Sequence, residues 1–162
     1  EFKFQRPLIG SMNAVFETKY EILDGYLATK NIVNLTKLRK FIDSKIANKT
    51  TNYYTIYDII IDKWNEFVPI DVDTIVSKES LNVSEKELTR LDVIIEMLLE
   101  EKNILNIEED IVNKFIFKEL AGIQTNRYLV FGLVNTYFRD KYSVYEETKH
   151  YRGGTFYIKT KL

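Results

Sequence analysis

The sequence contains no cysteine, one histidine (His150) and two prolines among 162 residues. The lack of cysteine excludes a disulfide framework, a thiolate zinc site and a cysteine nucleophile, and it fits a reducing compartment. With a single histidine, the usual ligand sets for zinc are excluded as well. No apolar run approaches the ~18 residues of a membrane-spanning helix. No basic start is followed by an apolar run, so we expect an intracellular protein (cytoplasm, nucleoid or nucleus) without a membrane partner.

Motifs for catalysis are also missing. The sequence has no phosphate-binding P-loop, no G-x-G-x-x-G and no G-x-S-x-G. Acidic residues cluster at Glu100-Glu101 and at 108–110, but neighbouring carboxylates on a helix point about 100° apart and do not converge on one ion. We therefore expect no catalytic residue, no metal site, no cofactor and no enzymatic activity.

The composition is that of a folded domain, with 45% hydrophobic, 29% charged and 14% aromatic residues. The net charge of −1 argues against a generally basic nucleic-acid binder, so any such surface must be a local patch. Residues 1–11, EFKFQRPLIGS, precede Met12, and Glu-Phe and Gly-Ser are encoded by common cloning sites. We interpret them as a tag or a fused peptide, or else as a native segment packed on the domain. Residues 12–162 are expected to form one domain.

Apolar spacing predicts helices at 34–49, with Asn34 as cap, at 52–67, and from Thr125 or Asn126 to Phe138. Residues 103–118 fit either a β-hairpin or a loop followed by a helix from Glu108. At the C-terminus, Gly153-Gly154 between two alternating runs predicts a hairpin with a two-residue turn and Tyr151 opposite Phe156. The core face of this hairpin would carry Tyr145, Tyr151, Phe156, Ile158 and Leu162. No internal repeat is visible in the sequence.

Residues 72–91, VDTIVSKESLNVSEKELTRL, have the pattern of a helix-turn-helix. Asp73 would cap a short helix over 74–80, and Ser84 with Glu87 forms a capping box for a longer second helix. The stretch IVSKESLNVSEKELTRLDVIIEMLLEEKNIL resembles the winged-helix superfamily over about residues 72–105. The resemblance implies a mainly α fold of the α+β class, namely a winged-helix-like domain with a C-terminal β-hairpin. Its wing would be 103–118 or the terminal hairpin, and the plain alternative is an ordinary helical pair.

In DNA-binding members of that superfamily the second helix enters the major groove, which implies base contacts from Lys86, Thr89 and Arg90. However, residues 81–110 hold nine Asp and Glu against three Lys and Arg, which opposes phosphate binding. Basic residues concentrate at 28–49, with six against one acid, and at 139–162, with six against three. The predicted phosphate contacts are Lys37, Arg39, Lys40, Lys149 and Arg152, although solvated faces explain such patches equally simply.

Two functions remain open at this point. The first is a non-catalytic winged-helix DNA-binding protein in regulation or replication. The alternative is a winged-helix protein-interaction module of a larger replication or transcription assembly that binds a short peptide of a partner. In that case the acidic second helix would meet a basic partner. The peptide contacts would be the apolar anchors Phe4, Pro7 and Leu8 and the charge of Arg6. The sequence does not fix the oligomeric state.

Overall fold

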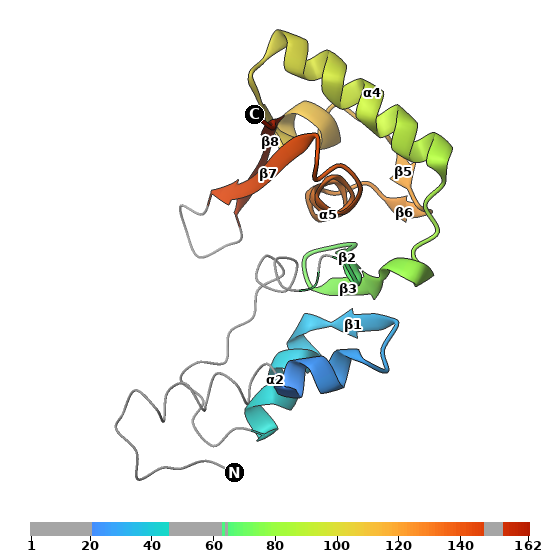
Figure 1. The fold of residues 1–162 in the computed structure, drawn as a ribbon, viewed down its shortest axis with the longest axis vertical. Coiled ribbons are helices and arrows are strands. Elements are labelled where there is room, and N and C mark those ends of the chain that lie inside the picture. Colours follow the sequence, from blue (N-terminus) through green and yellow to red (C-terminus); the bar gives the residue numbers. More distant parts are fainter. Residues whose placement is uncertain (1–20, 46–62, 64, 148–153) are drawn as a thin grey trace.

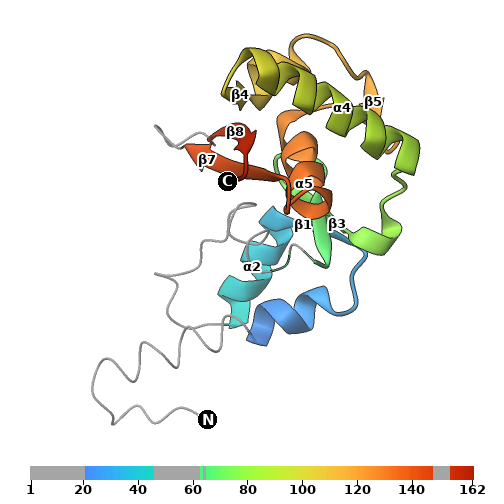
Figure 2. The same ribbon diagram turned by 45° about the horizontal axis from the view of Figure 1, so that its top comes forward.

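The computed structural model describes residues 21–45, 63, 65–147 and 154–162 (Figures 1 and 2). Of these residues, 47% are helical and 25% lie in strands, which form three small antiparallel sheets. The chain therefore has a mixed α+β fold. No helix within the described ranges is long and apolar enough to cross a bilayer.

The first unit starts with a helix over residues 21–27, followed by β1 (Ile32–Asn34), α2 (Leu35–Lys45), β2 (Phe67–Pro69) and β3 (Thr74–Ser77). Its sheet has the order β1-β3-β2. Asn34 caps α2, since its Oδ1 accepts the Lys37 N–H at 3.0 Å, which confirms the predicted cap. Leu35, Leu38 and Ile42 form the buried face of α2.

The second unit follows a 3₁₀ turn, η1 (Lys78–Ser80), and begins with α4 (Glu85–Glu101) and β4 (Ile104–Asn106). A π-helical turn η2 (Ile107–Val112) and a small hairpin of β5 (Glu119–Leu120) and β6 (Ile123–Gln124) lead to α5 (Arg127–Tyr137). The chain ends with β7 (Tyr142–Glu147) and β8 (Thr155–Thr160), in a sheet of order β4-β8-β7. The predicted capping box of Ser84 and Glu87 and the predicted cap Asn126 are both present.

The two three-stranded sheets share one strand order. In each of the two three-stranded sheets, the first strand pairs with the third and the third pairs with the second, and all pairs are antiparallel. In each, a helical segment follows the first strand, and the last two strands are consecutive in the chain. The repetition is therefore one of topology, which explains why no repeat is visible in the sequence.

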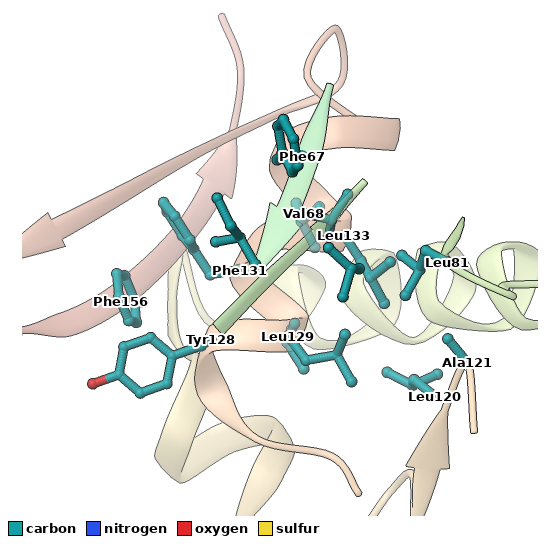
Figure 3. Packing of buried hydrophobic residues seen from close by; sticks show 14 of the residues in the cluster. Phe67, Val68, Leu81, Leu120, Ala121, Tyr128, Leu129, Phe131, Leu133 and Phe156 are labelled. Atoms are coloured by element: carbon teal, nitrogen blue, oxygen red, sulfur yellow. The ribbon is translucent and has the colours of Figure 1, made fainter. Parts of the chain in front are cut away.

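Helix α5 is the centre of the core and lies between the two sheets (Figure 1). Nine consecutive residues of α5, from Tyr128 to Thr136, are buried. Towards β8, Phe131 stacks on Phe156 with ring centroids 4.4 Å apart, and Figure 3 shows Tyr128 on the same side. Towards β2, Gly132 lies so close that a Cβ built on it would be 2.5 Å from Cγ and Cδ of Pro69. The helix thus holds both sheets.

The predicted helix-turn-helix is wrong, and with it the winged-helix fold class. Residues Thr74–Ser77 form strand β3, which pairs with both β1 and β2. Of the short helix predicted over 74–80, only the turn Lys78–Ser80 is helical. Three consecutive β-branched residues, 74–76, favour this extended form, because their side chains pack well in the middle of a sheet. Asp73 caps no helix; its carbonyl accepts the Leu35 N–H at 2.7 Å.

Neither alternative for residues 103–118 is fully right. Ile104–Asn106 forms a strand, but it pairs with β8 and not with a neighbouring arm, so the hairpin is wrong. The helical alternative is closer, since η2 begins at Ile107, where the Asn106 Oδ1 accepts the Glu109 N–H at 3.1 Å. The predicted helix at 52–67 lies almost entirely outside the described residues, and Phe67 belongs to β2.

The terminal hairpin exists, but its predicted turn and register are wrong. Tyr145 pairs with Tyr157 and Glu146 with Phe156, so the strands end at Glu147 and resume at Thr155. This register differs by an odd number of residues from the predicted one, which turns every side chain of β7 to the opposite face. Phe156 and Ile158 are buried as predicted. Tyr145, however, stacks on Tyr157 on the side of the sheet that faces away from the core, and Leu162 is exposed. Tyr151 lies outside the described residues.

We predict that Gly132→Ala destabilises the protein. The added Cβ would overlap the Pro69 ring, and forcing an extra methyl into a packed core typically costs about 1–3 kcal/mol. Urea unfolding followed by circular dichroism would measure the loss. Gly25→Ala is the matched control, because it lies in the helix over 21–27 and nothing comes within 4 Å of its added Cβ. Alanine there should leave stability unchanged or raise it by up to about 1 kcal/mol. Equal midpoints for Gly132→Ala and the wild type would contradict the close packing of α5 on β2.

Candidate functional site

Among the residues that the structure describes, those predicted to bind DNA do not converge on one surface. Lys86 and Thr89 are exposed on α4, while Lys37 and Lys40 are exposed and Arg39 is half-buried on α2. Figures 1 and 2 show α2 and α4 at opposite ends of the described structure. Two further predicted phosphate contacts, Lys149 and Arg152, lie outside the described residues. The predicted peptide contacts also lie outside them, namely Phe4, Arg6, Pro7 and Leu8.

Arg90, the predicted main base reader, is used within the fold. Its Nη2 donates to the carbonyl of Ile116 at 3.3 Å, and its guanidinium carbon lies 4.9 Å from the centre of the Phe117 ring. A guanidinium stacked on an aromatic ring has one face covered and part of its hydrogen-bonding capacity filled. Reading a base in a groove would require Arg90 to leave both contacts.

The acidic residues of 81–110 are also largely paired inside the molecule. Asp92 and Glu96 both bind Lys141, Asp110 lies 2.9 Å from Lys102 Nζ, and Glu108 lies 3.6 Å from Arg127. Glu87 accepts the N–H groups of Ser84 and Ala121, at 3.1 and 2.8 Å. Burial would raise the pKa of Glu87, but these hydrogen bonds outweigh it and lower the pKa. Five of the nine acidic residues of this stretch are thus engaged within the fold, while Glu85, Glu100, Glu101 and Glu109 are exposed.

Tyr142 fastens β7 to α4. Its hydroxyl donates to Asp92 Oδ1 at 2.6 Å, and Lys141 Nζ lies 3.0 Å from the same oxygen. The Tyr142 ring is buried. Burial, followed by the hydrogen bond to Asp92 and the charge of that carboxylate, raises the pKa of Tyr142 well above its ordinary value. The cluster is a structural clamp between a strand and a helix.

The open side of the terminal sheet carries a different set of residues. Leu105, Ile158 and Val144 form one row across the three strands and face the core. Because neighbouring residues of a strand point to opposite faces, the rows on either side face away from the core. We call this surface the outer face; it consists of Ile104, Lys159 and Ser143 in one row and Asn106, Tyr157 and Tyr145 in the next.

Two tyrosines and a lysine dominate the outer face. The rings of Tyr145 and Tyr157 stack with centroids 5.4 Å apart and planes inclined by 23°. Lys159 Nζ lies 5.6 Å from the centre of the Tyr145 ring. Both rings are partly accessible and Lys159 is exposed, so aromatic surface and positive charge meet at the solvent. Such a surface can stack a planar ring and attract an anion next to it.

The sequence alone contained part of this site. Alternation along residues 155–160 predicts Lys159 on the polar face, but the turn predicted at Gly153-Gly154 gives the wrong register and puts Tyr145 on the core face. The pairing of Tyr145 with Tyr157 becomes visible only once the register is known. Among the described residues, no group of three or more His, Cys, Asp or Glu is placed to hold a metal ion.

Comparison with known proteins adds no relative to this picture. No protein-family model, no curated protein and no solved structure matches the chain. The outer face combines partly accessible aromatic rings with the positive charge of Lys159.

We predict that Tyr142→Phe removes part of the alkaline sensitivity of the fold. A group whose pKa is raised on folding contributes stability that is present below its unfolded pKa, near 10, and is lost as the pH rises towards the folded value. Urea unfolding at pH 8 and at about pH 11 would measure this loss, which should be smaller in Tyr142→Phe than in the wild type. Tyr145→Phe keeps the clamp and should lose as much stability as the wild type. Equal losses in all three proteins would rule out the role of Tyr142.

Proposed function

We propose that the protein is a non-catalytic nucleic-acid-binding protein that takes single-stranded DNA or RNA on the outer face of its terminal sheet. The observation that carries the proposal is the stacked pair Tyr145–Tyr157 with Lys159 beside it. Aromatic rings on an open sheet bind unpaired bases by stacking, and a neighbouring cation binds the phosphate. A protein of this kind would act inside the cell, in replication or its regulation.

A single strand fits this surface better than a duplex. Stacking on a side chain requires bases that are free of their partners. Reading a duplex in the major groove usually requires an exposed helix. In the second unit, the helix before the terminal hairpin is α5, and its nine buried residues hold the core. On α4, Arg90 is engaged with Ile116 and Phe117.

Few cations are available at the outer face, which makes the binding modest. Lys159 is exposed next to the rings, whereas Lys161 Nζ donates to the Arg139 carbonyl at 3.1 Å and Lys141 binds Asp92 and Glu96. Lys149 and Arg152 stand between β7 and β8 in the sequence and remain proposed phosphate contacts. With a small number of neutralised phosphates, the salt dependence of binding should be shallow.

We predict that Tyr157→Ala weakens the binding of single-stranded oligonucleotides about 5- to 150-fold, since base stacking on a side chain is worth about 1–3 kcal/mol. Fluorescence anisotropy with labelled oligothymidylate and oligouridylate at low salt would measure the change. Tyr157→Phe keeps the ring and should bind like the wild type. Binding to a labelled duplex should be weaker than to the single strand.

We further predict that Lys159→Glu weakens the same binding and makes it less dependent on salt. Lys37→Glu is the matched control, because it makes the same charge change at an exposed site on α2. It should leave the affinity nearly unchanged. If Lys37→Glu abolishes binding while Lys159→Glu and Tyr157→Ala do not, the nucleic acid lies on α2. If the wild type binds no oligonucleotide at low salt, the proposed function is wrong.

A further inference from the structure

Helix α4 carries apolar residues on the side that faces solvent. At about 100° per residue, Val93 lies opposite Leu91 and Ile95, the two residues through which α4 is buried in the core. The outward side of such a helix is normally polar. Val93, however, is 49% exposed, and Met97, one turn further along, is 57% exposed. Figures 1 and 2 show α4 at the rim of the described structure, where a partner can reach this side.

Two opposite charges lie on the same side of α4, at equal distances from Val93. Lys86 comes seven residues before Val93 and Glu100 seven residues after it, and seven residues are close to two full turns. Both side chains are exposed, and neither makes an ion pair with another of the described residues. Along the helix, the outward side is therefore positive, then apolar, then negative, with each charge about 10 Å from Val93.

The two charges are placed against the dipole of their own helix. A helix favours anions in its first turn and cations in its last turn, but Lys86 lies in the first turn and Glu100 in the last. Each also lies one turn from a like charge on the same helix, Lys86 from Arg90 and Glu100 from Glu96. Both positions are therefore mildly unfavourable within the chain, and an opposite charge on another molecule would stabilise each of them.

We propose that this side of α4 binds the same side of α4 in a second copy of the chain, with the two helices antiparallel. An interface between identical molecules must be complementary to itself, because a twofold axis brings residue i of one copy to residue j of the other, and j to i. With the axis at Val93, this residue contacts its own counterpart, and Lys86 of each copy comes level with Glu100 of the other. A purely acidic or purely basic partner would satisfy only one of the two charges.

The interface consists of one helix from each copy, so the dimer is weak and transient. A stable complex usually involves about 20–30 residues on each side, whereas the whole of α4 has 17 residues. Parallel packing is disfavoured, because it brings Lys86 next to Lys86 and Glu100 next to Glu100. The site is separate from the outer face, whose residues lie on β4, β7 and β8.

Sedimentation equilibrium of the full chain tests the proposal. The mean mass should rise with concentration between about 10 μM and about 1 mM, where weak complexes form. Val93→Glu brings two carboxylates together at the axis and should weaken association at least about tenfold. Because Val93 is exposed, the urea midpoint of this variant should equal that of the wild type. Val72→Glu makes the same change at an exposed valine outside α4 and should associate like the wild type.

Charge reversal tests the antiparallel arrangement. Lys86→Glu and Glu100→Lys should each weaken association, because like charges then meet in the dimer. Both changes agree better with the helix dipole, so neither should lower the urea midpoint. An equal mixture of the two variants should associate again, since both charge pairs of the mixed dimer are opposite. The double variant, Lys86→Glu with Glu100→Lys, should associate like the wild type.

A crosslink locates the axis. The chain contains no cysteine, so Val93→Cys introduces a single thiol. Under mild oxidation it should form a disulfide-linked dimer faster than Val72→Cys, because only the thiol at the axis meets its counterpart closely enough. A mean mass that stays that of the monomer at about 1 mM would overturn the proposal. Association of Val93→Glu as strong as that of the wild type would also overturn it, and failure of the mixed charge variants to associate would contradict the antiparallel pairing.

Discussion

The contact of α5 with β2 is the constraint on which the rest of the structure depends. Gly132 allows the helix to lie directly against Val68 and Pro69, while the neighbouring Phe131 packs on Phe156 of β8. Figure 3 shows Leu133 between Val68 and Leu81, on the side away from Phe156. One helix therefore completes the cores of both units, and the buried apolar residues form a single cluster. The two three-stranded sheets share a strand order, but they are joined through a common helix.

This burial of α5 decides which parts of the molecule can bind. A helix that is covered on all sides is unavailable to a partner, so a partner must bind other surfaces, such as the outer face of the terminal sheet. On the outer face Tyr145 pairs with Tyr157, and Lys159 lies two residues further along β8, opposite Ser143.

Features that depend on residues close together in the chain were predicted well from the sequence. Features that depend on contacts between distant residues were not. The caps Asn34, Ser84 with Glu87, and Asn126 depend on residues within one turn, and all are present. The strand Thr74–Ser77 depends on pairing with β1, some forty positions earlier in the chain. Its β-branched residues favour a strand, but the candidate cap Asp73 and the capping box that follows indicated a helix-turn-helix. The register of the terminal hairpin follows from burial against α5 and the clamp at Tyr142, which no turn motif reveals. Hence Lys159 could be assigned from alternation, whereas the stack of Tyr145 on Tyr157 and the engagement of Arg90 could not.

The shared use of α5 also has a consequence for synthesis on the ribosome. Strands β1 to β3 leave the exit tunnel well before Arg127, at which α5 begins. Until then Val68, which is fully buried in the finished fold, has no helix to cover it. A nascent chain whose translation stops before Arg127 would therefore expose aggregation-prone apolar surface to chaperones and to other chains. Completion of the amino-terminal half waits for the carboxy-terminal half to be translated.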